Sequence, residues 1–316
     1  MNRNLYIGRA LLVLVPFLTV ASEAQAVAGA NRVFVAAKSG NDANACNSVA
    51  TPCQTLAGAY SQVATGGEII VLESGGYGPV TITGAVTIDA PEGVTAFIHP
   101  PSGDAITVSA GASDVVTLRG LTLNGGTNSG ITVNSVGTLN VENCFITGFA
   151  FFGIHMASAG QLNVKGTDVT GCEVGIALDG NSSGARHASI DHCHLDGNNT
   201  GFIADTTSSA SSSTAATNTT ANNNGAYGWM CGAASSGQDV LDLEFCTGSG
   251  NGIDGIVADS ANAASVTSLS NCVFANNTFY GVYRENFGPV STRGNNTGAG
   301  NGSGATAGTI GSFTGF

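Results

Sequence analysis

Hydrophobic and polar positions along the chain follow a short phrase that recurs: a small residue, an apolar residue, any residue, and a second apolar residue. Successive copies start 22 to 27 residues apart. A nearly fixed period of this size indicates a repeat architecture in which each copy forms one structural unit. The copies occupy residues 105–108, 130–133, 153–156, 175–178, 201–204, 228–231, 255–258 and 281–284.

A second phrase precedes the first by about nine residues, with glycine or asparagine between them as a turn signal. Clear copies are residues 141–144, 190–193, 243–246 and 269–272. A leucine-rich repeat would need a leucine and asparagine ladder, and a propeller blade would need roughly 40 residues. Short alternating strands with one turn of chain per repeat instead predict an all-β, single-stranded, right-handed parallel β-helix, in which equivalent residues form columns.

The cysteines fit this arrangement. Aligning the second phrase places six residues on successive coils, and strand alternation points them inward as a ladder of small buried side chains. Cys246 and Cys272 lie on neighbouring coils, so a disulfide between them is the alternative. Cys46 and Cys53, seven residues apart, are expected to form a local bridge. The inward column is Cys144, Thr167, Cys193, Thr219, Cys246 and Cys272.

The ends of the chain have their own patterns. Residues 51–66 carry apolar positions at helical spacing and predict a short N-terminal capping α-helix, followed by strands at 68–72 and 80–88. Residues 206–217, rich in Ser, Thr and Ala, are interpreted as a lengthened loop. The tail from Asn295 is interpreted as an irregular last coil or a frayed end. We expect residues 27–80 to form the cap and first strands, and residues 81–316 the β-helix.

The first 26 residues predict a targeting segment rather than a part of the folded domain. Arg3 and Arg9 precede an apolar run of about 11 residues at 10–20, and Ala24-Gln25-Ala26 supplies a cleavage site, as in a secretory signal peptide. The run is shorter than the roughly 20 residues that span a membrane. We therefore expect a soluble exported protein, secreted, periplasmic or at the cell surface, with no membrane span.

Charge narrows the function. Only 9% of residues are charged and the formal net charge is -12, which becomes -13 when the first 26 residues take two arginines and one glutamate with them. Neutralising nucleic-acid phosphates needs a basic face, so a nucleic-acid partner is excluded. The expected partner is a polysaccharide or a cell-surface glycan. No cysteine pair has zinc-site spacing.

The segment from Thr51 to Ile88 resembles the opening of exported proteins of the pectin lyase-like superfamily. In those proteins a capping helix leads to a Gly-Gly-Glu-Ile strand and a Gly-x-Tyr turn, here Gly67-Glu68-Ile69 and Gly76-Tyr77. The resemblance implies the β-helix fold. It implies less about activity, because the superfamily holds lyases, glycoside hydrolases, esterases and adhesins. Polygalacturonase motifs are absent. Ile190-Asp191-His192-Cys193 is similar to a pectate-lyase phrase, without its tryptophan or the arginine motif.

Function in such folds lies on outward columns, and one column here is acidic. Asp179 and Asp205 are expected one coil apart, and Asp259 and Glu285 likewise, with Gly232 between the pairs. Stacked like charges are unfavourable, so the column needs an explanation. Three interpretations are open. They are a pair of catalytic acids in a glycoside hydrolase, a calcium site, or residues that begin turns at the strand ends.

The neighbouring outward column adds His155, expected diagonally beside Asp179, and an apolar stripe with Met230 and Tyr283. Sugar sites often pair an apolar face with carboxylates. We therefore predict Asp179, Asp205, Asp259 and His155 as catalytic residues, with Met230, Tyr283 and Glu285 binding substrate. Asp191 and His194 do not converge with His192, so no metal ligands are assigned and no cofactor is expected, calcium being the alternative. A non-enzymatic adhesion or structural β-helix is the second hypothesis, and a calcium-dependent lyase is the third.

Overall fold

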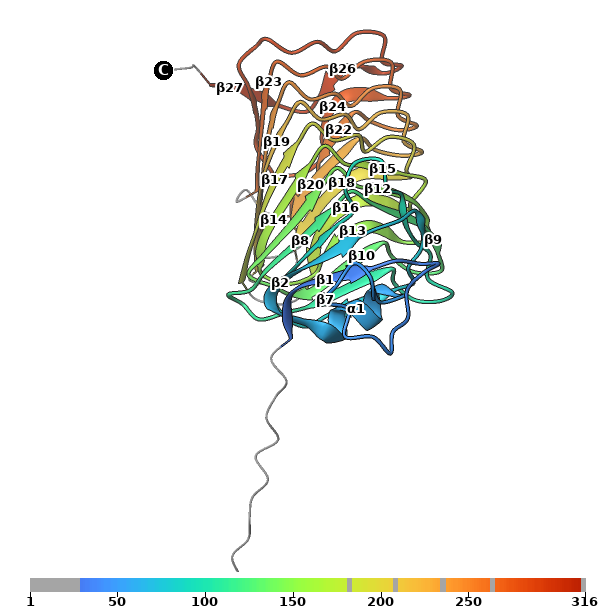
Figure 1. Ribbon diagram of the computed structural model, residues 1–316. Helices are drawn as coiled ribbons and strands as arrows, with labels where there is room; N and C mark the ends of the chain where they lie inside the picture. Colours follow the sequence, from blue (N-terminus) through green and yellow to red (C-terminus); the bar gives the residue numbers. More distant parts are fainter. Residues whose placement is uncertain (1–28, 181–183, 207–209, 234–236, 262–264, 314–316) are drawn as a thin grey trace, which may run out of the picture.

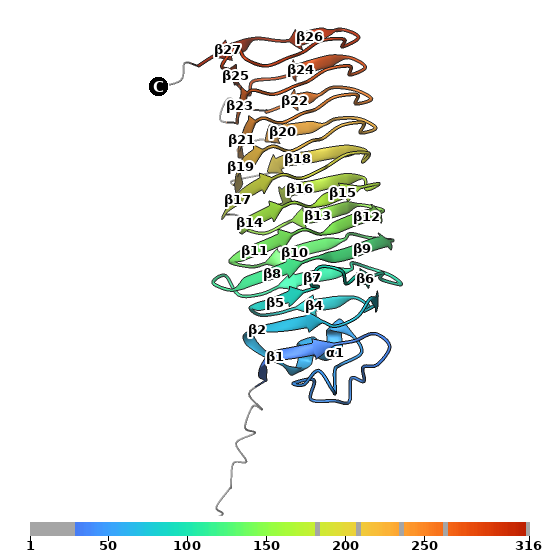
Figure 2. The ribbon, with the colours of Figure 1, turned by 45° about the horizontal axis from the view of Figure 1, so that its top comes forward.

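The computed structural model describes residues 29–180, 184–206, 210–233, 237–261 and 265–313. In these residues one helix and 27 strands form a stack of coils, with α1 (Leu56–Gln62) at the N-terminal end (Figures 1 and 2). Every strand pairing is parallel, and the strands form three sheets along the stack, as the repeat predicts. The predicted right-handed parallel β-helix is confirmed.

One face of the stack is a twelve-stranded sheet that runs its whole length. Its strands follow chain order, one from each coil (Figure 2). They are β1 (Ala30–Val35), β2 (Val63–Val71), β5 (Val86–Asp89), β8 (Val115–Arg119), β11 (Thr138–Glu142), β14 (Gly160–Lys165), β17 (Gly184–Asp191), β19 (Ala210–Thr217), β21 (Gln238–Glu244), β23 (Val266–Ser270), β25 (Val290–Thr292) and β27 (Ile310–Ser312).

The second face is a ten-stranded sheet. It consists of β4 (Val80–Ile82), β7 (Ile106–Ser109), β10 (Ile131–Ser135), β13 (Phe152–Met156), β16 (Val174–Gly180), β18 (Thr200–Thr206), β20 (Trp229–Ala233), β22 (Ile256–Ala258), β24 (Tyr280–Arg284) and β26 (Gly304–Ala307). The third is a five-stranded sheet of β3 (Gly75–Gly76), β6 (Ala96–Ile98), β9 (Leu121–Gly126), β12 (Phe145–Phe149) and β15 (Asp168–Thr170).

The small residue that opens each copy of the first phrase has a steric reason. A Cβ on Gly153 would lie 2.2 Å from Cγ1 of Val169 and 2.6 Å from the carbonyl oxygen of Gly175 on the next coil. The backbone therefore passes too close to its neighbours at this corner for a side chain. The apolar positions that follow point inward, and Trp229 is fully buried among them as expected.

The cysteine predictions are confirmed. Cys46 and Cys53 form a disulfide. The other six cysteines are free and buried, so the alternative bridge between Cys246 and Cys272 is not formed. The inward column is in register, since Thr167 accepts from the backbone N–H of Cys144 at 3.2 Å. Burial raises the pKa of Cys144 and of Cys246 to about 12, so these thiols are protonated at neutral pH and pack as small apolar groups.

The capping helix forms, but it is shorter than predicted. Thr55 caps its N-terminus by accepting from the N–H of Gly58 at 2.9 Å, and Leu56 and Ala59 fill the end of the core. The helix ends at Gln62 because Val63 turns to extended backbone and begins β2. The β-branched side chain of Val63 favours that conformation. The sequence interpretation also missed β1, which pairs with β2 and extends the sheet.

Two interpretations of irregular structure were wrong. The described part of residues 206–217 is strand rather than one lengthened loop, because Thr206 ends β18 and Ala210–Thr217 forms β19. Short Ser, Thr and Ala side chains hid the strand signal, although their burial alternates along most of β19. The tail likewise continues the stack as β26 and β27. The predicted signal peptide, residues 1–26, lies outside the described residues, among which no helix is long and apolar enough to cross a membrane.

Corners between the sheets carry an asparagine ladder that the sequence interpretation missed. In each coil an asparagine side chain accepts from the backbone N–H of its counterpart one coil earlier, at 2.8–2.9 Å. The first four rungs are buried. The ladder therefore satisfies backbone groups that strand pairing leaves open at the corner. Its members are Asn198, Asn224, Asn251, Asn277 and Asn301.

Candidate functional site

The predicted acidic column exists on the outer side of the ten-stranded sheet. Asp179 pairs in register with Asp205, and Asp205 pairs with Gly232. Asp179 and Asp205 lie inside β16 and β18, so the interpretation that they begin turns is wrong. Asp259 and Glu285 directly follow β22 and β24, and Glu285 N–H donates to Ala258 at 3.0 Å. We call Asp179, Asp205, Gly232, Asp259 and Glu285 the acidic column.

His155 and Asp179 come together as expected. Nε2 of His155 is hydrogen-bonded to Oδ1 of Asp179 on the neighbouring coil. The ring of Phe152 stacks on the imidazole, with centroids 4.3 Å apart and an interplanar angle of 24°. The exposed fractions of the His155 and Asp179 side chains are 20% and 33%, so the pair is held but open to solvent. A carboxylate that orients an imidazole in this way makes it able to accept or donate a proton.

Arg186 lies behind this pair, and the sequence interpretation missed it. Its side chain is fully buried although it belongs to β17 of the twelve-stranded sheet. Nη2 donates to the carbonyl oxygen of Ala157 at 2.8 Å and Nε to that of Met156 at 3.3 Å, at the end of the strand that carries His155. Burial lowers the pKa of Arg186, and the carboxylates of Asp179 and Asp239 oppose that shift. A buried guanidinium thus supports the outer pair from within.

The apolar stripe is also in place. Met230 pairs with Val257, and Val257 pairs with Tyr283. Val257 is only 2% exposed although it points outward, because neighbouring side chains cover it. We call His155, Ala177, Ile203, Met230, Val257 and Tyr283 the apolar column. It spans six coils, and the last five of these also carry the acidic column.

A third group, Tyr227, Asp254 and Tyr280, lies on the far side of the apolar column, and the sequence interpretation missed it. Tyr280 and Tyr283 stack with ring centroids 5.5 Å apart. Asp254 is 2% exposed and accepts from the N–H of Tyr280 at 2.7 Å. Burial raises the pKa of Asp254. The signal was present in the sequence, since all three residues directly precede the glycine that opens the phrase.

The tyrosines and carboxyls share one electrostatic environment. Burial raises the pKa of Tyr227, and the carboxylates of Asp254, Glu285 and Asp259 raise it further. Burial raises the pKa of Tyr283 as well, and the same three carboxylates raise it further. Ala258 pairs with Arg284, so Asp259 and Glu285, which follow them, lie on neighbouring coils, and with Tyr283 these predicted residues form one patch.

The pH dependence of stability tests the burial of Asp254. A carboxyl whose pKa is raised by folding stabilises the folded state fully below its unfolded pKa of about 3.9, and that contribution is lost as pH rises through the folded value. Asp254→Asn does not titrate and keeps an oxygen that accepts from Tyr280. We therefore expect the variant to gain stability relative to the wild type between about pH 4 and pH 7. Urea unfolding at both pH values measures this, and a pH-independent difference would contradict it.

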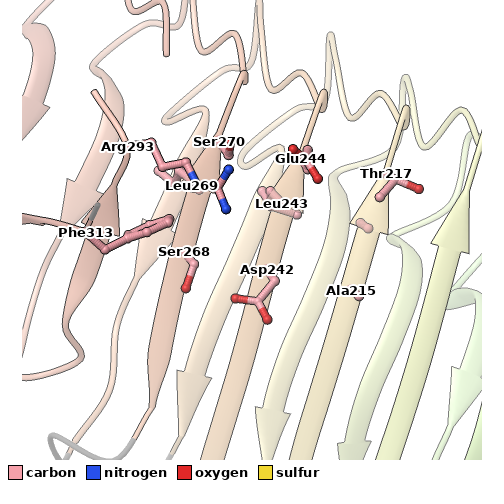
Figure 3. A pocket seen from close by; sticks show the side chains of 11 residues that line it. Ala215, Thr217, Asp242, Leu243, Glu244, Ser268, Leu269, Ser270, Arg293 and Phe313 are labelled. Atoms are coloured by element: carbon pink, nitrogen blue, oxygen red, sulfur yellow. The ribbon is translucent and has the colours of Figure 1, made fainter. Parts of the chain in front are cut away.

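The acidic column does not line the well-formed hollow of about 300 Å³, which lies on the outer side of the twelve-stranded sheet. Figure 3 shows Arg293 and Phe313 beside each other at one end of this hollow, with Asp242 and Glu244 on β21, beyond the strand that carries Ser268 and Ser270. The Arg293 guanidinium lies over the Phe313 ring, 5.4 Å from its centroid. A second hollow, of about 180 Å³, lies at the C-terminal end of the core. Two further hollows, of about 320 and 550 Å³, are lined by other residues, so the acidic column lines none of these four hollows.

Metal ligation finds no support in the part of the chain that the structure describes, where no group of three or more His, Cys, Asp and Glu side chains could hold an ion. Asp191 instead accepts from Thr217 at 2.8 Å and contacts His192. His194 contacts Thr220 at 3.0 Å. These residues are surface groups that bond to neighbours on the next coil or along the chain, and they do not converge.

Comparisons with known proteins agree with this architecture. Residues 104–263, about half of the chain, match the model of the right-handed β-helix region family, and the chain belongs to that family. No curated protein sequence matches the chain. Among solved structures, pectate lyase Pel9A has a TM-score of 0.66 at 15% identity, over 88% of this chain and 78% of that one. The GH136 lacto-N-biosidase from Eubacterium ramulus has a TM-score of 0.48 at 10% identity, over 90% of this chain and 67% of that one. At these identities the likeness shows the fold alone.

Proposed function

We propose that this protein is exported and acts on a polysaccharide that lies along the outer face of the ten-stranded sheet. The observation that carries the proposal is the hydrogen-bonded pair His155–Asp179 with Asp205 in register beside it. In this arrangement an imidazole and two carboxyls are half-exposed on neighbouring coils. The fold of pectate lyase Pel9A supports the proposal as an analogy.

The chemistry proposed is glycoside hydrolysis. Register places Asp205 one coil, about 4.8 Å, from Asp179, so a carboxylate nucleophile and the His155–Asp179 acid–base pair lie on adjacent coils, as a retaining mechanism requires. Asp205 attacks the anomeric carbon and expels the leaving group, which takes a proton from His155. Asp179 holds the imidazole in place. Water then hydrolyses the glycosyl ester as His155 removes its proton, which restores the starting state.

The experiment measures products released from neutral, amino and acidic polysaccharides, with calcium and with a chelator. Asp205→Asn and His155→Ala are each expected to lower release by at least about 100-fold, the scale of a lost acid–base group. Asp242→Asn on the opposite sheet is the matched control and is expected to keep wild-type release. Release that survives both site variants would contradict the assignment, and release that needs calcium would favour a lyase instead.

A second candidate is a non-catalytic glycan-binding β-helix. The position of the acidic column favours it, since the column lines none of the hollows of about 300, 180, 320 and 550 Å³. Binding to a polysaccharide without product release would select this candidate over hydrolysis.

A further inference from the structure

The basic residues of the chain are distributed unevenly over the stack. Nine lysines and arginines occur in the sequence, and seven lie in the described residues. Five of these are on or directly after strands of the twelve-stranded sheet, with Arg186 pointing into the core, and Lys38 lies in the turn that follows β1. The seven are Arg32, Lys38, Arg119, Lys165, Arg186, Arg284 and Arg293.

Arg284 is the one that belongs to the ten-stranded sheet, and it takes an inward position. It pairs in register with the buried Ala258, which pairs with the buried Cys231. Its Nη1 and Nη2 donate to the carbonyl oxygens of Thr309 and Phe287, at 3.3 and 3.1 Å. Among the described residues, therefore, no lysine or arginine points outward from this sheet. His155 is the basic side chain of the face, and Asp179 already engages it.

Among the described residues, no lysine or arginine is bonded to Asp254, Asp259 or Glu285 of the same face. Asp259 is bonded to the neutral amide of Asn286, Asp254 to a backbone N–H, and Glu285 is exposed. From β16 to β24 the face covers five coils spaced about 4.8 Å apart, roughly 19 Å along the stack. A continuous negative electrostatic potential along such a face repels polyanions and attracts cations.

The tyrosines point to the same kind of ligand. The stacked rings of Tyr280 and Tyr283 are partly exposed beside the carboxyls. A sugar ring packs its apolar C–H face on an aromatic ring, and an ammonium group is attracted to the face of that ring. Met230 extends the apolar surface by one further coil beyond Val257.

We propose that this face selects a glycan that carries free amino groups and no carboxylate, sulfate or phosphate groups. The inference names the substrate class of the site proposed above and rests on that site being the glycan-binding face. It distinguishes the chain from pectate lyase Pel9A, whose name gives an acidic polymer as its substrate. Ammonium groups of the polymer pair with Asp259 and Glu285 of the acidic column while its sugar rings lie on the apolar column.

The test compares three oligosaccharides of equal length by titration calorimetry at low salt. They are a β-linked glucosamine oligomer, its N-acetylated form, and an oligogalacturonate. We expect tightest binding to the glucosamine oligomer, weaker binding to the N-acetylated one, and weakest binding to the oligogalacturonate. The glucosamine affinity should fall as salt rises, because exposed ion pairs are screened.

Two double variants with equal net charge locate the binding. Asp259→Asn with Glu285→Gln should weaken glucosamine binding about tenfold, since each exposed ion pair contributes a factor of a few. Asp242→Asn with Glu244→Gln, on the twelve-stranded sheet, should leave it unchanged. Equal losses in both variants, or oligogalacturonate binding as tight as glucosamine binding, would overturn the inference.

The outcomes separate this inference from the proposed hydrolysis. Selective glucosamine binding without product release would support the substrate class and contradict the enzyme. Release of products from oligogalacturonate would support an enzyme and contradict the substrate class.

Discussion

Asn251→Ala is expected to lower the free energy of unfolding by about 2–5 kcal/mol, the sum of two buried donors left without an acceptor. Oδ1 of Asn251 accepts from the backbone N–H of Asn224 at 2.9 Å and from its side-chain amide at 3.1 Å. Asn251 is 1% exposed, so water does not replace the lost oxygen. Urea denaturation followed by circular dichroism measures the change.

Asn301→Ala is the matched control for the ladder. Asn301 makes the same two bonds to Asn277, at 2.9 Å each, but it is the last rung and only partly buried. Because Asn301 itself is partly exposed, water replaces its oxygen when it is removed, so the expected loss is about 1 kcal/mol or less, the net value of an ordinary hydrogen bond. Equal losses at both rungs would mean that burial of the ladder contributes little to stability.

Arg186→Met is expected to destabilise the fold by about 3–5 kcal/mol, the range for removing one partner from a buried charged cluster. The substitution keeps a long apolar side chain but leaves the carbonyls of Met156 and Ala157 without their donors. It also leaves the buried carboxyl of Asp239 without a nearby cation. Thermal unfolding and urea titration of the purified variant measure the loss.

Arg293→Met makes the same substitution at an exposed arginine. Arg293 contacts the ring of Phe313 at the surface of the twelve-stranded sheet, so its loss is expected to cost about 0.5–1 kcal/mol, the worth of an exposed cation–π contact. Arg186→Lys completes the series, because it keeps the charge but loses the planar donor fork. If Arg186→Met cost no more than Arg293→Met, the buried guanidinium would not be a structural support for the His155–Asp179 pair.

The buried Arg186 links the stability of the fold to the proposed function of the His155–Asp179 pair. The strand end that carries His155 is held by the same guanidinium that faces Asp179 electrostatically. A charge inside the stack thus sets the position of groups outside it. Removing the Arg186 guanidinium from water is unfavourable, because burial disfavours its charged form and lowers its pKa. Such a cost is expected at a site that must hold polar groups in a fixed geometry.

Several features of the fold were predictable from sequence, because a parallel coil places each residue beside the one a period away. That rule was sufficient to align Cys144 with Thr167 and Asp179 with Asp205, and both alignments are confirmed. It also placed His155 diagonally beside Asp179. The rule failed where side chains were too short to give a pattern, as in β19 (Ala210–Thr217), and where a helical pattern ran on into a β-branched residue at Val63.

The coil period, the inward and outward columns and the local Cys46–Cys53 bridge could all be predicted from the sequence. Each depends on the alternation of apolar and polar residues along a strand or on residues that are near neighbours in the chain. Contacts between charged groups of different sheets became visible only in the three-dimensional structure. Arg186 reaches the strand of His155, and Asp254 shares the environment of Tyr227 and Tyr283, because of how each coil closes at its corners. The geometry of a corner depends on how strands of different sheets pack against each other. The alternation of apolar and polar residues within one strand carries no information about that packing.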